Sequence, residues 1–456
     1  MDFVRINEND NVTVSLETGH KSAFCDIKKG DDIIKYGYPI GIATSDIKKG
    51  EHVHSHNMKT KLGDILSYEY KPCFSPLTPA SPFCINAFVR ENGEIGIRND
   101  IWIVPTVGCV NSTGKILSEK TGAIYFSHPY GCSQLGDDMK ITQLVLRGLI
   151  KHPNAGGVLV LGLGCENNNI GEMKKILGEV NEKRVRFLNV QDCEDEISEG
   201  IRIIEELKEN AKKDVREPVS AGRLKIGLKC GGSDGFSGIT ANAVVGSVTD
   251  RICAMGGTAV LTEVPEMFGA EQVLFERCIN EEVFNKGVRL INGFKQYFTN
   301  HNQPVSENPS PGNKEGGITT LEEKSLGCVQ KGGRAPVTDV LTYGDTLKEK
   351  GLNLLDGPGN DIVSVTNLSA AGCHLVLFTT GRGTPLGSAV PTVKIASNEM
   401  ISKKKAHWID FCAFGEREKR ADELLSLIKR VSDGEETKNE ILGNREIAIF
   451  KDGVTL

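Results

Sequence analysis

The sequence lacks an excess of positive charge, a long apolar run and a recognisable secretion signal. Its 456 residues include 54 Lys and Arg against 60 Asp and Glu, a formal net charge of −6. Nucleic-acid binding depends on a basic surface, so we expect no nucleic-acid partner, whereas a few local cations and amides suffice for a small acidic ligand. No segment reaches the roughly 18 apolar residues that span a bilayer, so we expect no membrane partner.

The cysteines form no CxxC pair and no zinc-type spacing, although there are 13 of them. Their odd number and the absence of a signal peptide in residues 1–19 predict a cytoplasmic protein with free thiols. Six cysteines adjoin glycines at predicted turns: Cys109, Cys132, Cys165, Cys230, Cys328 and Cys373. We interpret each one singly as a small buried residue, and we keep iron ligands or a nucleophile as the alternative.

No repeat of fixed period is present, and the chain is too long for one ordinary core. Apolar strands alternate with helical segments from about residue 101, which predicts an α/β fold with mostly parallel, helix-covered sheets. The predicted divisions are a small β module over residues 1–75, a linker and hairpin over 76–100, a first α/β domain over 101–215 and a second over 222–456. Residues 302–334 are polar and rich in Pro and Gly, so we expect a structureless loop there.

Three histidines alternate within Glu51-His52-Val53-His54-Ser55-His56-Asn57, in the predicted β module. Alternate residues of a strand share a face, so His52, His54 and His56 would point the same way and could reach one metal ion. His20 belongs to the same module and is a further candidate ligand. The alternative is a polar strand face that binds nothing.

A glycine-rich stretch, residues 229–242, follows an apolar strand over 224–228 and precedes a helix over 243–255. Its glycines let the backbone approach a ligand closely, and its polar residues lie beside free amides at a helix N-terminus, where an anion is favoured. These polar residues are Ser233, Asp234, Ser237, Thr240 and Asn242. In parallel sheets, ligands bind beyond the carboxyl ends of strands. The alternative is a tight connection in which Ser237 or Thr240 caps the helix.

Several charged residues adjoin glycines or polar turns. Four cations could hold a carboxylate: Arg98, Lys229, Lys331 and Arg382. Four carboxylates could carry protons or bind a hard metal ion: Glu166, Glu263, Glu266 and Glu271. For any one of them, the alternative is an ordinary solvated surface residue.

Many short motifs, in one order, make the chain resemble the altronate and galactarate dehydratases, a sugar-acid dehydratase family that also includes a sulfolactate sulfo-lyase. The N-terminal motifs, similar to the family's SAF or β-clip domain, are Gly19-His20-Lys21, Lys35-Tyr36-Gly37, Asp46 to Gly50 and Val53 to Asn57. The motifs of the body are Gly93 to Asn99, His128 to Cys132, His152 to Glu166, Lys229 to Asn242, Thr262 to Glu271, Asn308 to Cys328 and Phe378 to Thr384. One departure is Asp192 to Glu196, where we expect a glycine pair after Gln191.

The resemblance implies a dehydration that depends on Fe(II) or Mn(II), in which a 2,3-dihydroxy acid such as D-altronate loses water to give a 2-keto-3-deoxy acid in hexuronate catabolism. It further implies a metal held by His54 and His56 with His20. The substrate's polar groups would contact the 229–242 stretch together with Arg98, Lys331 and Arg382. The catalytic base stays open between His128, His152, Lys229 and Glu166.

Other interpretations remain open from the sequence. Galactarate is an alternative substrate, and a (R)-sulfolactate sulfo-lyase would use the same proton abstraction with sulfite as the leaving group. The cysteines could instead hold an iron–sulfur cluster. A sugar-acid-binding protein without activity is the non-enzyme alternative. The oligomeric state is also open, a homo-oligomer included.

Overall fold

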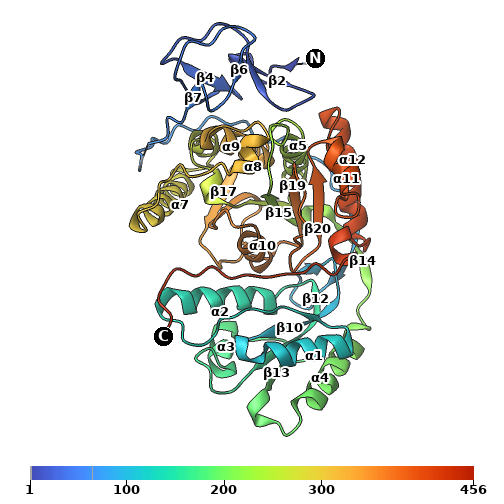
Figure 1. Ribbon diagram of the computed structural model, residues 1–456. Coiled ribbons are helices and arrows are strands. Elements are labelled where there is room, and N and C mark those ends of the chain that lie inside the picture. The colour runs from blue at the N-terminus through green and yellow to red at the C-terminus, as the bar shows by residue number, and fades with distance from the viewer. Residues whose placement is uncertain (1–2, 64) are drawn as a thin grey trace.

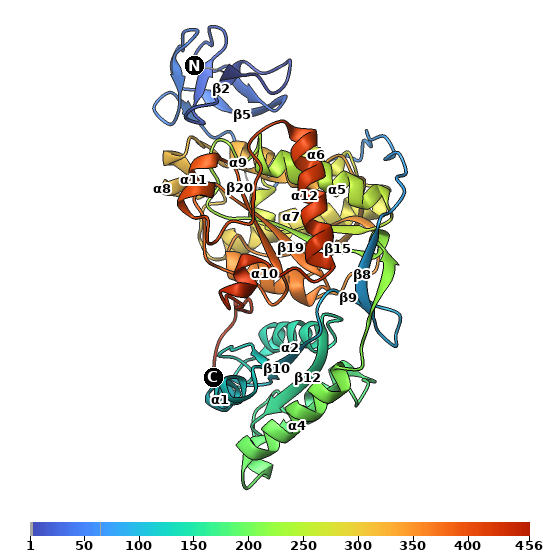
Figure 2. The same cartoon turned by 90° about the vertical axis from the view of Figure 1, so that its right-hand side faces the viewer.

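The computed structural model describes residues 3–63 and 65–456, and its domains lie in a row that differs from their order in the chain (Figure 1). The small N-terminal β domain lies at one end. The chain then crosses to an α/β domain at the other end, here called the far domain, and returns to build the α/β domain between them, here called the middle domain (Figures 1 and 2). The predicted α/β class with a small β module is confirmed.

Short antiparallel strands build the N-terminal domain, in sheets of order β1-β2-β3-β6 and β4-β5-β7. Their bounds are β1 Phe3–Val4, β2 Val12–Ser15, β3 Lys21–Ala23, β4 Asp32–Lys35, β5 Tyr38–Ala43, β6 His52–Val53 and β7 Met58–Lys59. Apolar residues such as Val12, Ile33 and Ile40 form the small core between the sheets. The predicted long histidine strand is wrong, because β6 ends at Val53.

The far domain has a parallel sheet of order β11-β10-β12-β13. Its elements are β10 Asp100–Pro105, α1 Asn111–Thr121, β11 Ile124–Tyr125, α2 Gly136–Ile150, β12 Ala155–Gly162, α3 Ile170–Leu177, β13 Val185–Asn189 and α4 Glu196–Ala211. Every residue of β12 is buried, as expected for a central strand with helices on both faces.

The middle domain has a seven-stranded parallel sheet of order β17-β18-β16-β15-β19-β20-β21. The strands are β15 Lys225–Cys230, β16 Thr258–Leu261, β17 Val337–Leu341, β18 Gly351–Leu355, β19 Leu375–Thr380, β20 Thr392–Ala396 and β21 Phe411–Cys412. The helices are α5 Ala241–Ala254, α6 Glu271–Phe275, α7 Glu281–Asn300, α8 Pro311–Glu315, α9 Leu321–Cys328, α10 Asp361–Ala370, α11 Glu399–Lys404, α12 Arg417–Ser432 and α13 Lys438–Ile441. Helices α5 and α10 pack against alternate residues of the central strands and so cover opposite faces of the sheet.

A three-stranded antiparallel sheet of order β14-β8-β9 joins the far and middle domains (Figure 2). Its strands are β8 Cys84–Val89, β9 Ile95–Gly96 and β14 Arg216–Ser220. The hairpin predicted about Asn92-Gly93 is present between β8 and β9, with Gly93 at a φ of 83°. The chain therefore enters and leaves the far domain through neighbouring strands.

The prediction of a structureless loop over residues 302–334 is wrong, because α8 and α9 lie within it. Ser310 and Asn313 form a capping box at the start of α8, with Pro311 in the first turn. The Thr320 side chain caps α9 by accepting the Glu323 N–H. The Pro and Ser residues that suggested a loop instead mark helix starts.

Helix α9 attaches the N-terminal domain to the middle domain. The Glu323 carboxylate, buried in the contact, lies 2.8 Å from both Lys21 Nζ and Lys35 Nζ. Burial alone would raise the pKa of Glu323, but the two ammonium groups hold that pKa below its usual range. Next to it, the Glu322 carboxylate accepts hydrogen bonds from the Thr60 hydroxyl and the Lys61 N–H. Polar contacts therefore fix the orientation of the N-terminal domain.

Among the described residues, none of the helices combines the length and the apolar character that a bilayer crossing requires.

Replacing Glu323 with Gln should destabilise the docked N-terminal domain. Two buried ammonium groups would lose their carboxylate, and breaking a buried ion pair typically costs about 3–5 kcal/mol. Urea unfolding followed by fluorescence, together with protease cleavage between residues 60 and 83, measures the effect. Glu349→Gln, at an exposed position, is the control. A loss below about 1 kcal/mol, typical of an exposed pair, would contradict this account of docking.

Candidate functional site

Four imidazoles gather at the edge of the N-terminal domain that faces the middle domain. The pairing of β3 with β6 brings His20 beside His52, with 3.1 Å between His20 Nδ1 and His52 Nε2. A turn follows β6, in which the Asn57 side chain accepts the His54 N–H and donates to the His52 carbonyl. This turn places the His54 and His56 rings 5.5 and 5.7 Å from the His52 ring. The three predicted ligands therefore cluster, together with His52, through a turn and not through one strand face.

The environment of this cluster favours neutral imidazoles. Partial burial, and then the neighbouring His20, lower the pKa of His52. Burial also lowers the pKa of His54. Neutral imidazole nitrogens keep the lone pairs that a metal ion needs. The cluster is thus chemically suited to bind a borderline divalent cation.

Helix α8 connects the histidines with the glycine-rich loop, residues 231–242. His54 Nε2 lies 2.9 Å from the Lys314 carbonyl oxygen, and the Gly235 N–H donates to the Gly316 carbonyl at 2.7 Å. Gly235 also touches Gly19 so closely that a Cβ on Gly235 would lie 2.0 Å from the Gly19 oxygen. The predicted metal ligands and the predicted anion loop are therefore neighbours.

Asp234 organises the glycine-rich loop. Its carboxylate accepts hydrogen bonds from the Ser237 hydroxyl at 2.8 Å, the Ser397 hydroxyl at 3.0 Å and the Asn398 amide at 2.9 Å. The Thr240 hydroxyl donates to the Ser397 carbonyl instead of capping α5. The simple capping alternative is therefore wrong, since the side chains tie the loop to the end of β20, which is separated from β15 by β19.

Two further loop residues make structural contacts. The Asn242 amide donates to the Gly327 carbonyl and accepts from the Thr379 hydroxyl. The Ser233 carbonyl accepts from the Asn313 side chain. Within the described residues, the N–H groups of Gly232, Ser233 and Gly238 have no protein acceptor. Among the described residues, the N–H groups of Phe236 and Ala241 also have no protein acceptor, so five backbone donors of the loop remain for an anion.

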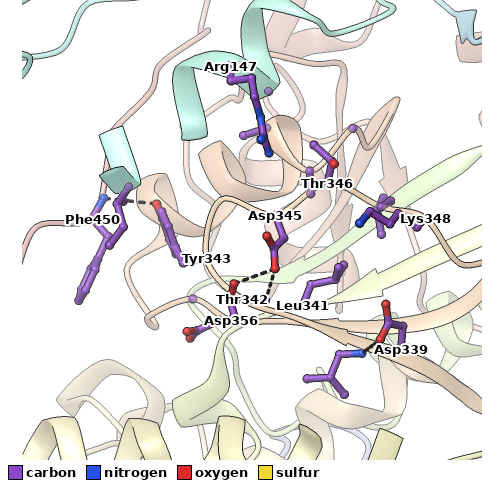
Figure 3. A pocket seen from close by; sticks show the side chains of 18 of the residues that line it. Arg147, Asp339, Leu341, Thr342, Tyr343, Asp345, Thr346, Lys348, Asp356 and Phe450 are labelled. Carbon is purple, nitrogen blue, oxygen red and sulfur yellow. Dashed lines mark hydrogen bonds between the residues drawn. The ribbon is translucent and has the colours of Figure 1, made fainter. Parts of the chain in front are cut away.

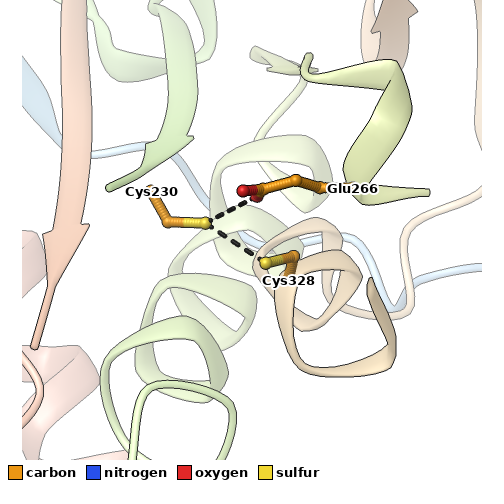
Figure 4. A group of neighbouring side chains, drawn as sticks. All are labelled: Cys230, Glu266 and Cys328. Atoms are coloured by element: carbon orange, nitrogen blue, oxygen red, sulfur yellow. Dashed lines mark hydrogen bonds between the residues drawn. The ribbon is translucent and has the colours of Figure 1, made fainter. Parts of the chain in front are cut away.

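A buried thiol–carboxylate group lies below the loop, at the end of β15 (Figure 4). Cys230 Sγ lies 3.0 Å from Glu266 Oε2 and 3.3 Å from Cys328 Sγ. All three offer ligand atoms within 4.8 Å of one another, a spacing that suits one metal ion. However, Lys331 Nζ lies 2.8 Å from Cys230 Sγ, and Lys324 Nζ lies 2.9 Å from Glu266 Oε1. These ammonium groups supply the positive charge, so we interpret the group as an ion-pair network.

The network stabilises a thiolate. A hydrogen bond from the Cys328 thiol, reinforced by the Lys331 ammonium, lowers the pKa of Cys230 to about 7. Lys229, next to it, contacts the Glu263 carboxylate and lies 2.7 Å from Asp361 Oδ1. Burial by itself lowers the pKa of Lys229, but these carboxylates raise it above its usual value. These contacts favour the ammonium form of Lys229, and its role as the catalytic base stays a prediction.

The expectation of solvated surface residues is wrong for most of the charged candidates. Three of the four carboxylates pair with a buried lysine: Glu263 contacts Lys229, Glu266 contacts Lys324 and Glu271 contacts Lys295, whereas Glu166 is held by neutral donors. Arg382 alone among the four cations is exposed, at the outer rim of the loop, where it pairs with Glu315 of α8 at 2.6 Å. Burial without a partner would have been too costly, which explains why these charges occur in pairs.

Arg98 is not brought to the loop. Its guanidinium donates to the Glu440 carboxylate and to the carbonyls of Ile97, Val431 and Glu435. These contacts use the guanidinium to join the hairpin sheet to the C-terminal helices. A role in substrate binding stays a prediction without a supporting contact.

The candidate bases His128, His152 and Glu166 lie in the far domain and are not brought to the loop either. His128 Nε2 lies 2.8 Å from the Pro105 carbonyl, and its Nδ1 accepts the Tyr130 N–H. Burial lowers the pKa of His128 to about 4. His152 Nε2 lies 3.1 Å from the Cys373 carbonyl, across the contact with the middle domain.

Glu166 accepts the N–H groups of Leu163 and Gly164, and the Thr106 hydroxyl at 2.6 Å. These contacts hold turns in place. The catalytic roles of the three residues stay predictions.

Sequence reasoning missed Lys394, which is fully buried on β20. The register places Lys229, Phe378 and Lys394 in one row across β15, β19 and β20. Lys394 Nζ lies 3.5 Å from the Phe378 ring centre and has no hydrogen-bond partner among the described residues. Burial lowers the pKa of Lys394 to about 7. Its signal in the sequence was a lysine inside an otherwise apolar strand.

A cavity of about 1180 Å³ opens elsewhere, between the far and middle domains (Figure 3). Its lining includes Arg147, Tyr343, Asp345, Asp356 and Phe450. None of the four clustered histidines and no residue of the glycine-rich loop lines it. Cavity size alone therefore does not identify the site.

Comparison with known proteins covers nearly the whole chain. Residues 15–61 match the altronate/galactarate dehydratase SAF domain, residues 87–212 the second domain of D-galactarate dehydratase/altronate hydrolase, and residues 221–455 the C-terminal domain of D-galactarate/altronate dehydratase. Altronate dehydratase of Bacillus subtilis (strain 168) is 51% identical, with 100% of this chain and 99% of the relative covered. Altronate dehydratase of Escherichia coli (strain K12) is also 51% identical, with 98% and 94% covered. Galactarate dehydratase (L-threo-forming) of the same bacterium is 30% identical, with 87% and 80% covered.

Replacing Lys229 with Met should destabilise the middle domain by about 3–5 kcal/mol, because the buried Glu263 and its neighbour Asp361 lose their cation. The free energy of unfolding in urea measures the effect. Lys225→Met, on the same strand, is the control: its pair with Glu94 is part-exposed and should be worth no more than about 1 kcal/mol. Equal losses in the two variants would contradict the interpretation of Lys229 as part of a buried charge network.

Proposed function

We propose that this chain, which belongs to the D-galactarate and altronate dehydratase family, removes water from an altronate-like aldonate to give a 2-keto-3-deoxy acid. The observation that carries the proposal is the 51% identity to two altronate dehydratases over essentially the full length. The match includes the N-terminal β domain with its clustered histidines. The galactarate-specific relative is more distant, at 30% identity. Sugar-acid dehydration is a carbon–oxygen lyase reaction, so the non-enzyme alternative is set aside.

The histidine cluster supports the further proposal that Fe(II) or Mn(II) binds at His20, His54 and His56, with His52 as an additional donor. Nitrogen donors from imidazoles suit iron better than manganese, which prefers oxygen ligands, so we favour Fe(II). When bound, such an ion polarises the substrate carboxylate and 2-hydroxyl and makes the C2 proton easier to remove.

The residues around the cluster supply orientation and charge. The free N–H groups of Gly232, Ser233 and Gly238 can donate hydrogen bonds to an anion, as backbone N–H groups at a helix N-terminus do. Arg382 lies beside them, since a Cβ on Gly232 would be 3.4 Å from Arg382 Cβ, and its guanidinium can exchange Glu315 for a substrate carboxylate. We therefore propose that the loop and Arg382 hold the acid group, while Asp234 keeps the loop in shape.

The thiols support a proposal for the cellular location. All 13 cysteines are free in the structure. A chain with this many unpaired thiols is suited to a reducing compartment, and we propose the cytoplasm.

Removing the metal should abolish activity, and Fe(II) should restore it better than Mn(II) or Mg(II). The double variant His54→Ala/His56→Ala should lower kcat/KM by about 100-fold or more, because even residues that only support metal ligands contribute about 10–100-fold. Bound metal per chain and release of 2-keto acid are the measurements. His407→Ala, an exposed histidine far along the chain, is the control. Undiminished turnover by the chelated protein would contradict the metal proposal.

Among a panel of aldonates, aldarates and sulfolactate, altronate should be the best substrate. Galactarate carries a second carboxylate where altronate ends in a hydroxymethyl group, and the proposed contacts of the loop and Arg382 serve only one carboxylate. We expect kcat/KM for altronate to exceed that for galactarate by at least about tenfold. The assay is 2-keto acid release, with sulfite release for sulfolactate. A preference for galactarate, or release of sulfite, would replace the proposed substrate.

A further inference from the structure

The carboxyl edge of the far-domain sheet carries a second group of residues that the proposed function does not use. Strands β11, β10 and β12 are adjacent in the sheet, and a Gly-Cys pair follows each of them: Gly131-Cys132 after β11, Gly108-Cys109 after β10 and Gly164-Cys165 after β12. Parallel strands present their carboxyl ends at one edge, so the three thiols belong to the same edge of the sheet.

Backbone contacts hold these three turns against one another. The Gly108 N–H donates to the Tyr130 carbonyl at 2.8 Å, and the Asn168 N–H donates to the Gly131 carbonyl at 2.9 Å. A Cβ on Gly131 would lie 2.0 Å from the Thr106 oxygen, so only glycine permits this approach. Gly131 and Gly164 have φ angles of 100° and 129°, which other residues rarely adopt. The contacts of His128 and Glu166 described above brace the same turns.

The three thiols are exposed, although free cysteine is among the most buried residue types. The interpretation of Cys109, Cys132 and Cys165 as small buried residues is therefore wrong. Polar donors lie beside two of the sulfurs: Gln191 Nε2 is 3.5 Å from Cys165 Sγ, and Ser133 Oγ is 3.9 Å from Cys132 Sγ. Such donors stabilise negative charge on ligated sulfur.

The three sulfurs are too far apart to share one metal ion. A single tetrahedral ion at about 2.3 Å from each sulfur requires thiols less than about 4 Å apart. Among the described residues, the three thiols are not a group whose ligand atoms all lie within 4.8 Å of one another. An iron–sulfur cluster is larger than one ion and keeps its cysteine ligands further apart.

A fourth cysteine at this edge, Cys193, is half-buried where the other three are exposed, although the Cys132 thiol also donates to an oxygen, Asn167 Oδ1, at 3.4 Å. Cys193 follows β13 but comes after Asp192 and not after a glycine, and its thiol donates to the Asn189 carbonyl at 3.4 Å. Partial burial, and then the nearby Glu199 and Asp192, raise the pKa of Cys193, which disfavours the thiolate that an iron would bind. Cys193 therefore serves as a control cysteine at the same edge of the sheet.

We propose that Cys109, Cys132 and Cys165 hold a [4Fe–4S] cluster in which one iron has no protein ligand. Three thiolates serve three of the four irons, and the remaining iron is open to an oxygen ligand such as water, a hydroxyl or a carboxylate. This site is separate from the histidine cluster, because the middle domain lies between the far domain and the N-terminal domain (Figures 1 and 2). This proposal goes beyond the proposed function, because binding of the cluster does not depend on whether the protein dehydrates a sugar acid.

The test is anaerobic reconstitution of the full chain with iron and sulfide, followed by assays of iron, acid-labile sulfide and visible absorption. We expect about four sulfides and about five irons per chain, because the histidine cluster binds one iron in addition to the four of the iron–sulfur cluster. Mild oxidation should remove the iron that lacks a thiolate and leave a three-iron form visible by electron paramagnetic resonance. Each of Cys109→Ser, Cys132→Ser and Cys165→Ser should lose the absorption and the sulfide.

Two matched control variants test whether cluster binding depends on these three cysteines and not on any exposed thiol. Cys193→Ser, at the same edge, and Cys84→Ser, exposed on β8, should retain the full cluster. Circular dichroism of every variant establishes that the fold persists. A wild-type chain that binds no sulfide, a Cys165→Ser variant that keeps the cluster, or a Cys193→Ser variant that loses it would overturn the proposal. Because the readouts are iron and sulfide, their failure leaves the dehydratase proposal standing, and the reverse also holds.

Discussion

The candidate site depends on one buried carboxylate, that of Glu323, held between Lys21 and Lys35. Lys21 follows His20 directly, so the ion pair that attaches the N-terminal domain also sets the position of a candidate metal ligand. Other residues of α9 contact the middle domain: Lys324 pairs with Glu266, and the Cys328 thiol lies beside Cys230. A single short helix thus couples the histidines of one domain to the end of a strand in another. Ion pairs are directional, which suits a contact whose purpose is orientation.

The carboxyl edges of the parallel sheets in the two α/β domains carry different kinds of residues. In the middle domain, the carboxyl edge of the sheet is covered by the N-terminal domain and by α8, and its charges are buried in pairs. In the far domain, the corresponding edge carries exposed thiols on glycine turns. Both edges follow the rule that parallel sheets offer ligand sites beyond their strand ends. One molecule therefore presents two such edges, with nitrogen donors at the first and sulfur donors at the second.

The fold class could be predicted from the sequence, because apolar periodicity is a short-range signal. The spacing of His54 and His56 suggested that they lie together, but a turn and the pairing of β3 with β6 bring them near His20. Which charges are buried could not be predicted. Lys229 looked like any polar residue beside a turn, and its environment depends on Glu263 and Asp361, which reach it only through the strand order of the sheet. The helices within residues 302–334 were missed because Ser310 and Pro311 are typical both of loops and of helix starts. His128 and Glu166 were candidate catalytic residues because they adjoin strand ends. Residues that only hold turns in place also occur there, so the sequence could not distinguish the two roles.

The order of the domains along the chain has a consequence for biosynthesis. The N-terminal domain leaves the ribosome long before α8 and α9 are translated, since these helices lie beyond residue 310. Until then Lys21 and Lys35 have no Glu323 to neutralise them, and they remain hydrated. Domains generally fold as units in the order of synthesis. The unpaired lysines would keep this early domain soluble and discourage premature association with other nascent chains, and the site could close only when most of the polypeptide has been made.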